Sequence, residues 1–273
     1  MILFVVEGSS REKKYFSNIS TVFFNTKNKI LTIFAPAEMN IYMLFCKLKE
    51  DNFETDIVEI IRECSNEAAK SLQNYSRKDF SEVYFFFDFD EHGNNIPDKY
   101  NISNVEALNE MLQYLDNETE TGKLYISYPM VEAIRDYYDE ICETSSGSCF
   151  RNRIDFGTYK HDSSTKAKNA DVSNYSFIDW SIVLFIFVSR ICCLFSANIA
   201  DREKYLKTVN PISIFEKEMI TYEGKAEIFI LSALPEFLLD YFAPLWNRIL
   251  GRRKNMPLNK RCSKNCDNII IKD

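Results

Sequence analysis

The chain has 273 residues, 46% of them hydrophobic and 14% aromatic, which is enough for one large domain or two small ones with a real core and too apolar for a disordered protein. Its net charge of −7 divides unevenly: the tail from Gly251 onward carries seven Lys or Arg and two Asp, so the tail is +5 and the remainder −12. An acidic body argues against a protein that coats duplex nucleic acid nonspecifically, but it does not exclude an enzyme that meets nucleic acid at one local basic site.

Four short apolar runs in the first half of the chain predict strands, and they alternate with segments of helical periodicity. The strands are expected at 2–6, 29–35, 82–88 and 123–129, and the helices from 11 onward and at 40–51, 56–72, 104–115 and 130–141. Ser9 or Ser10 can cap the first helix. Strands that alternate with helices need crossover connections, so the sequence predicts an α/β fold with a mostly parallel sheet flanked by helices.

The second half of the chain has a different pattern. The polar segment 155–176 is expected to be a loop, and long helices are expected at about 177–198, 211–222 and 226–242, with Pro235 kinking or splitting the last. We therefore expect a catalytic domain over 1–145, a helical region over 146–250 and a flexible basic tail over 251–273.

The segment 177–198 is apolar and almost long enough to span a bilayer. Arg190 lies inside it, Asp179 lies at its start, and no cluster of basic residues flanks it, so a buried core helix is favoured over a membrane-associated effector.

The compartment is indicated by the cysteines and the chain start. The eight cysteines are scattered, mostly within apolar runs, which favours buried reduced thiols in a cytoplasmic protein. The apolar start is interrupted at once by Glu7, so we do not expect a signal peptide. Cys262 and Cys266 lack a second pair or a nearby His that would complete a metal site.

Acidic residues recur where the predicted strands end. Glu7 follows the first strand, Asp88 and Asp90 end the third, and Glu132 lies just past the fourth. The carboxyl ends of parallel strands share one edge of a sheet, where ligands bind in such folds. Carboxylates suit Mg²⁺ or Mn²⁺, and Gly8 allows a tight turn or a close approach of the backbone. A metal there can stabilise phosphoryl transfer and activate water. A lone Asp-x-Asp is also typical of a solvated loop.

The combination of motifs resembles the Toprim family, in which one apolar strand ends in Glu-Gly and a later one in Asp-x-Asp. The string EGSSREKKYF is similar to the RloB-like and OLD-family nuclease branches. The spacing of Glu7, Glu12, Tyr15 and Phe16 matches the spacing in those branches. Arg11 stands where the family usually has Thr. SYPMVE resembles a further RloB-like motif, Ser-Asn-Pro-x-x-Glu, with Tyr128 in place of Asn. The resemblance covers roughly residues 1 to 140.

The resemblance implies a role for each acid. Asp88 and Asp90 would bind Mg²⁺ (or Mn²⁺), and Glu7 would be a ligand or a general acid/base. Glu12 and Glu132 would be supporting or second-metal ligands, although both also fit glutamates favoured by the dipole at a helix start. His92 is expected to be an exposed loop residue rather than a group that orients water.

The resemblance also implies a function, a Mg²⁺-dependent nuclease that cleaves DNA or RNA, transfer RNA included, in bacterial defence against phages. Lys160, Lys166 and Lys168 could contact a phosphate backbone or be solvated. The chain has no phosphate-binding loop of the Walker type, so any ATPase partner would be a separate protein. The alternative is a Toprim-fold module that binds a partner or regulates without catalysis. Assembly into homo-oligomers stays open.

Overall fold

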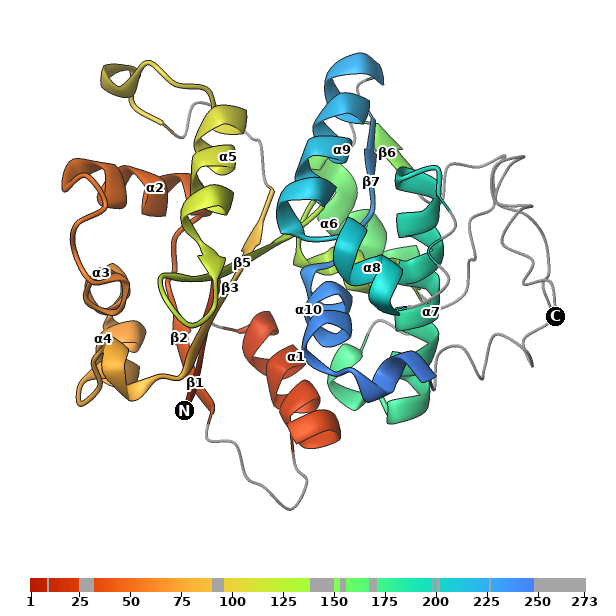
Figure 1. Cartoon of the computed structure of the whole chain (residues 1–273), viewed down its shortest axis with the longest axis horizontal. Helices are drawn as coiled ribbons and strands as arrows, with labels where there is room; N and C mark the ends of the chain where they lie inside the picture. Colours follow the sequence, from red (N-terminus) through yellow and green to blue (C-terminus); the bar gives the residue numbers. More distant parts are fainter. Residues whose placement is uncertain are drawn as a thin grey trace, which may run out of the picture. The chain divides into compact units, whose positions relative to one another are not determined.

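The structure of the protein, a computed structural model, divides into two compact units, Met1–Ile126 and Ser127–Asp273 (Figure 1). The sequence-based boundary lay near residue 145. The structure describes residues 1–247 apart from 9, 25–31, 90–95, 138–149, 153–155, 167–170, 198, 200–201 and 226. The expected basic tail therefore lies outside the described residues.

The first unit is built on a five-stranded sheet with the strand order β2-β1-β3-β5-β4. The strands are β1 (Ile2–Val6), β2 (Thr32–Pro36), β3 (Glu82–Asp88), β4 (Asp116–Asn117) and β5 (Gly122–Ser127). β1 pairs in parallel with both β2 and β3, whereas β4 and β5 form an antiparallel pair. The α/β class and the mostly parallel sheet flanked by helices are thus confirmed, and the first and third strands have the predicted bounds.

Aromatic packing holds the first helix on the sheet. α1 (Arg11–Ile19) continues into a π-helical turn, η1 (Ser20–Phe24). Phe16 lies 5.2 Å from Phe4 and 4.5 Å from Phe86 between ring centroids, so one side chain contacts both β1 and β3. β1 is buried on both faces, as its continuous apolar run predicts. This packing places the start of α1 beside the end of β1.

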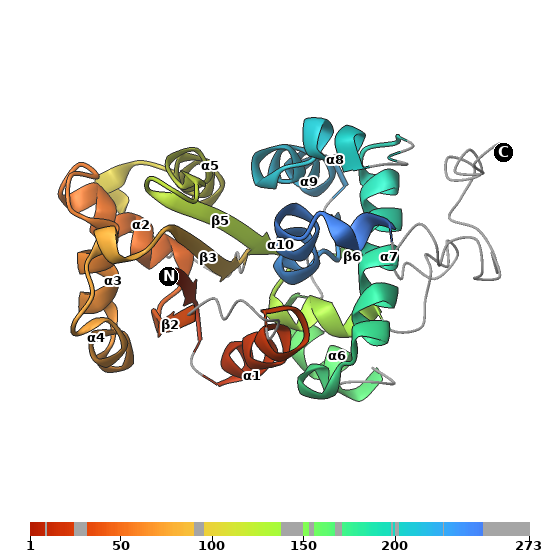
Figure 2. The ribbon, with the colours of Figure 1, turned by 60° about the horizontal axis from the view of Figure 1, so that its bottom comes forward.

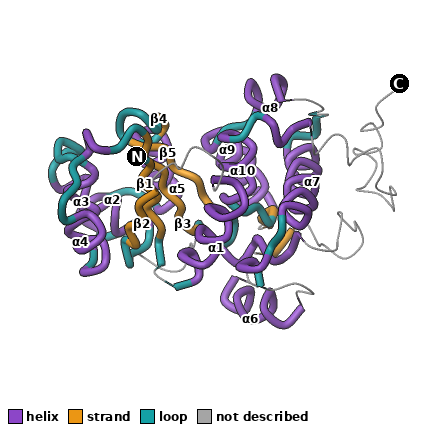
Figure 3. Tube along the Cα trace, turned by 90° about the horizontal axis from the view of Figure 1, so that it is seen from below, coloured by secondary structure: helices purple, strands orange, loops and turns teal. Residues whose placement is uncertain are grey.

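The other helices of the first unit lie across the sheet from α1 (Figures 1 and 3). They are α2 (Ile41–Glu50), α3 (Ile57–Cys64), α4 (Asn66–Leu72) and α5 (Asn104–Tyr114), with short 3-10 turns η2 (Arg77–Asp79) and η3 (Asp98–Tyr100). α2 and α5 lie side by side (Figure 2), and Lys49 Nζ is 2.7 Å from Glu110 Oε2 between them. Asn40 and Ser103 cap α2 and α5 through their side chains, which satisfies orphan amides at the helix starts.

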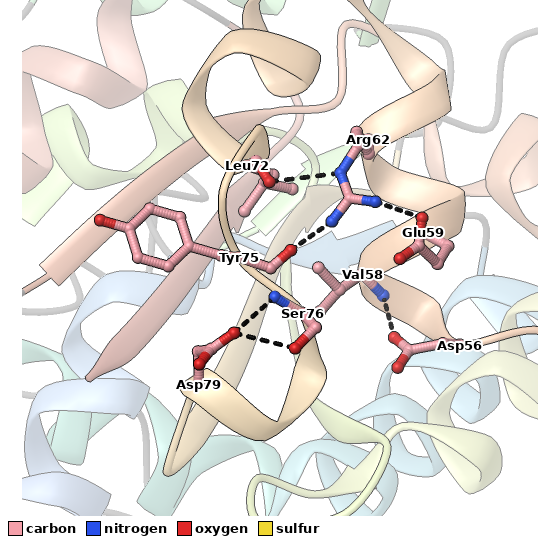
Figure 4. Close-up of polar contacts among 8 residues, drawn as sticks. All are labelled: Asp56, Val58, Glu59, Arg62, Leu72, Tyr75, Ser76 and Asp79. Carbon is pink, nitrogen blue, oxygen red and sulfur yellow. Dashed lines mark hydrogen bonds and ion pairs between the residues drawn. The ribbon is translucent and has the colours of Figure 1, made fainter.

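The helix predicted over 56–72 is broken at Ser65, which has extended backbone angles of −148° and 160°. Its hydroxyl accepts a hydrogen bond from Ala68 N at 3.0 Å and donates to Pro36 O at 2.6 Å, so the break both caps α4 and ties it to β2. Arg62 spans the break: it donates to Leu72 O at 3.2 Å, and also to Tyr75 O and Glu59 Oε2 (Figure 4). Periodicity alone does not reveal such a break, because the break depends on the hydrogen bond from Ser65 to Pro36, a residue distant in sequence.

The second unit is mainly helical, as predicted, and also contains a small sheet. Its elements are η4 (Val131–Tyr137), β6 (Phe150–Asn152), α6 (Phe156–Lys166), η6 (Val172–Asn174), α7 (Phe177–Leu194), α8 (Arg202–Thr208), α9 (Pro211–Lys225), β7 (Glu227–Phe229) and α10 (Ala233–Tyr241). β6 and β7 pair in antiparallel register, with Phe150 opposite Phe229.

Two local predictions in this unit are wrong. The segment 226–242 is not one helix, because its start forms β7 and Pro235 lies in the first turn of α10, where a missing N–H costs no helical bond. The polar segment expected to be a loop contains α6, which is anchored by buried Tyr159, whose hydroxyl donates to Asp136 Oδ2 at 2.5 Å. The helix predicted after the fourth strand is present over its described residues as the 3-10 helix η4.

α7 is a buried core helix, as the sequence predicts. It is the one described helix that is long and apolar enough to cross a membrane, but 67% of it is buried inside the protein, which is consistent with a soluble protein. Arg190 is 0% exposed; it donates to Ile230 O at 2.7 Å and Asp136 O at 2.8 Å and lies 4.2 Å from the centroid of the Tyr137 ring.

The described cysteines differ in oxidation state. Cys46, Cys64 and Cys192 are free thiols, and burial raises the pKa of Cys64 to about 11. Cys193 is disulfide-bonded, so the expectation of reduced thiols is wrong at this position.

Candidate functional site

Three neighbouring strands end in acidic residues at one edge of the sheet. β2, β1 and β3 are parallel, so their carboxyl ends meet at the same edge. Glu7 follows β1 directly, Asp88 is the last residue of β3, and Glu38 lies two residues beyond β2. The structure thus brings Glu7 and Asp88 to one edge, which is the binding edge of open parallel sheets.

Glu7 is held from both neighbouring strands. Its amide donates to Phe86 O at 3.2 Å, and its carbonyl accepts from Glu38 N at 2.8 Å. Its Oε2 accepts a hydrogen bond from Asp88 N at 3.0 Å. In a continuing parallel ladder the amide of Asp88 would donate to a main-chain carbonyl of β1. The carboxylate of Glu7 takes that amide at the point where β1 and β3 separate, so it is fixed beside Asp88.

Asp90 and His92 lie outside the described residues, but Phe89, the residue before Asp90, is described. Phe89 is fully buried, and its carbonyl accepts a hydrogen bond from the hydroxyl of Tyr42 at 2.6 Å. α2 therefore anchors the end of β3, and the anchor sits one residue after Asp88 and one before Asp90.

Glu12 is turned back toward the strand end. Its Oε1 accepts a hydrogen bond from Gly8 N at 3.2 Å. A Cβ at position 8 would lie 2.8 Å from Glu12 Oε1 and 3.0 Å from Oε2, so a side chain there would push the carboxylate of Glu12 away from its present position.

The remaining predicted residues belong to the second unit. Glu132 is on η4 in the second unit and is 2% exposed, so its carboxyl is not on the surface. Lys160 is exposed on α6, and Lys166 is the last residue of that helix. The side chain of Lys166 and the whole of Lys168 lie outside the described part.

Glu38 is the acidic residue at this edge that sequence reasoning missed. It is exposed and has a left-handed backbone with φ of 54°, which allows its amide to continue the hydrogen bonding of β2 with β1. The signal was present, because Glu38 closely follows the predicted strand 29–35, from which only Pro36 and Ala37 separate it.

The donor set partly fits a divalent cation. Glu7 and Asp88 supply carboxylate oxygens at adjacent strand ends, the ligand type that Mg²⁺ and Mn²⁺ prefer. Within the described residues no group of three or more His, Cys, Asp or Glu side chains is arranged to hold a metal ion. Asp90, which the motif would add, is not among them. The described pair would therefore form part of a site to which the motif adds Asp90.

The chain matches no family model, no curated protein and no solved structure. The resemblance to Toprim proteins thus depends on the motifs themselves and stays a prediction.

Proposed function

We propose that the protein is a Mg²⁺-dependent nuclease of the Toprim type that cleaves phosphodiester bonds in DNA or RNA, with transfer RNA among the candidate substrates. The observation that carries the proposal is the carboxylate of Glu7, held by the amide of Asp88 at the carboxyl edge of a parallel sheet. Two acids are thereby kept together at the edge where ligands bind in this class of fold.

Each residue of the edge has a part in this proposal. Glu7, Asp88 and, from the motif, Asp90 would hold Mg²⁺ or Mn²⁺, which supplies charge stabilisation and water activation in phosphoryl transfer. Glu7 is also the carboxylate that can take up a proton, and the bond from Asp88 N keeps it in place. Tyr42 keeps the end of β3 in position through Phe89 O.

The proposed partner is a nucleic acid, which would meet Lys160 on α6 and the basic tail through its phosphates. A separate ATPase partner, a role in phage defence and a cytoplasmic location belong to the same proposal. The disulfide at Cys193 is the one observation against the cytoplasm, because disulfides persist mainly in oxidising compartments.

A non-catalytic Toprim-fold module that binds a partner is the second candidate. It is favoured by Glu12 and Glu132, since one carboxylate is bonded to a backbone amide and the other is buried.

The test incubates full-length protein with single-stranded DNA, duplex DNA and total transfer RNA, with Mg²⁺, Mn²⁺ or EDTA. We expect metal-dependent cleavage that falls at least about 100-fold in Asp88→Asn, since even partners outside the ligand shell cost 10–100-fold. Glu63→Gln, an exposed acid on α3, is the matched control and should cleave normally. Mn²⁺ binding without cleavage by the wild type would favour the non-catalytic module, and cleavage by Asp88→Asn at the wild-type rate would refute the assigned site.

A further inference from the structure

We propose that Glu12 is a positioning residue, which anchors the turn after β1 and so aims Glu7, and that it is not a metal ligand. The role of Glu7 itself rests on the proposed function. What the structure adds is the contact of Glu12 with Gly8, in which Gly8 N donates to Glu12 Oε1 at 3.2 Å.

The amide of Gly8 needs an acceptor where the strand ends. The ladder of β1 continues only to the amide of Glu7, which donates to Phe86 O at 3.2 Å. A buried or partly buried N–H without an acceptor is costly, so the next amide must be satisfied by another group. Ser10, the N-cap residue of α1, makes no side-chain capping bond. Glu12, four residues after Gly8, supplies the acceptor instead.

Both carboxylate oxygens of Glu12 lie against Gly8. The position of a Cβ on Gly8 is 2.8 Å from Oε1 and 3.0 Å from Oε2, so the whole carboxylate covers the α-carbon of the glycine. A metal ligand must turn an oxygen toward the cation. The carboxylate of Glu12 is instead directed at the turn, where Oε1 holds the Gly8 amide and Oε2 lies against the same glycine.

The anchor acts on Glu7 through the peptide that joins it to Gly8. Glu7 is bonded to β3 through Phe86 O and Asp88 N, and to the segment after β2 through Glu38 N. Gly8 is the next point along the chain, and its lack of a side chain gives it the widest conformational freedom. The hydrogen bond to Glu12 removes that freedom. The backbone of Glu7 is then held by the strands on one side and by Gly8 on the other, and this fixes the direction of its side chain.

The experiment compares Glu12→Gln with Glu12→Ala in Mn²⁺ titrations of the full-length protein by calorimetry. Gln keeps an oxygen for the Gly8 amide but loses the charge of a metal ligand, whereas Ala loses both. We expect Glu12→Gln to bind Mn²⁺ within about twofold of the wild type and Glu12→Ala to bind about 10–100-fold more weakly, as for residues that orient ligands. Equal weakening in both variants, or no weakening in Glu12→Ala, would overturn the proposal.

A second measurement needs no metal and separates this proposal from the proposed function. The chain has only 7 Gly, so protein labelled with ¹⁵N-glycine gives a short amide spectrum in which Gly8→Ala identifies the Gly8 signal. Glu12→Ala should accelerate hydrogen exchange of the Gly8 amide by about tenfold or more, because about 1.4 kcal/mol of protection corresponds to that factor, and Glu12→Gln should leave the exchange unchanged. Unchanged exchange in Glu12→Ala would refute the anchor, whether or not the protein binds metal or cleaves nucleic acid.

Discussion

The first unit carries Glu7 and Asp88 at the ends of parallel strands, whereas the second unit buries Arg190, Glu218 and Glu236 with exposures of 0%, 0% and 4%. The strand-end acids Glu7 and Asp88 are partly buried, and the carboxylate of Glu7 accepts a hydrogen bond from the backbone amide of Asp88. The buried groups of the second unit also bond to the main chain: Arg190 to two carbonyls and Glu218 Oε2 to Phe229 N at 3.0 Å.

The two sets of residues differ in whether a side chain that is bonded to the backbone can still contact a ligand. A fully buried charge must be satisfied inside the protein, so its bonds serve the structure. A carboxylate at a strand end can be oriented by one amide and still meet a ligand at the edge of the sheet. We therefore expect substitutions in the second unit to change stability and those at the edge of the first unit to change binding.

Arg190→Met should give the largest loss of stability. It removes two charge-assisted hydrogen bonds, to Ile230 O and Asp136 O, and we expect it to lower the free energy of unfolding by about 3–5 kcal/mol. Urea unfolding measures this, with Lys217→Met on the exposed face of α9 as a control that should stay within about 0.5 kcal/mol of the wild type. A loss below about 1 kcal/mol would show that the buried guanidinium is not structural.

Glu218 should make the stability of the second unit depend on pH. Burial raises the pKa of Glu218 well above its ordinary value of 4.5, against a smaller opposite effect of the bond from Phe229 N. Because the folded pKa is the higher one, the stabilising contribution is complete below pH about 4.5 and is lost as the pH rises through the folded pKa, by about 1.4 kcal/mol per pH unit.

Glu218→Gln keeps an acceptor for Phe229 N and cannot ionise. The variant should match the wild type near pH 4 and become the more stable protein as the pH rises, as measured by chemical unfolding across that range. Glu216→Gln, an exposed acid on the same helix, should leave the profile unchanged. Parallel profiles for the wild type and Glu218→Gln would show that Glu218 is not buried in its neutral form.

The smallest effect on stability is expected at the sheet edge. Asp88→Asn leaves the amide of residue 88 available to Glu7 Oε2, so the free energy of unfolding should change by no more than about 0.5 kcal/mol. Urea unfolding beside the cleavage assay tests this, and a loss of several kcal/mol would contradict the contrast between the two units.

Particular residues show which features of the structure could be predicted from the sequence. The runs 2–6 and 82–88 predicted β1 and β3, and with them the placement of Glu7 and Asp88, because strand ends and their acids are local features. The same local pattern could not predict the break at Ser65, which depends on Pro36 O, or the pairing of β6 with β7, which joins Phe150 to Phe229. Those features depend on contacts between distant parts of the chain.

The sequence by itself determined the α/β class, the buried strands and helices of the first unit and the presence of acids at two strand ends, since periodicity and composition reflect which face of an element is buried. Only the tertiary structure decided that Glu7 takes the amide of Asp88, that Glu12 turns to Gly8 and that Glu38 joins the same edge. The direction of a side chain depends on the donors that neighbouring strands and helices bring to it, and those donors are distant in the sequence.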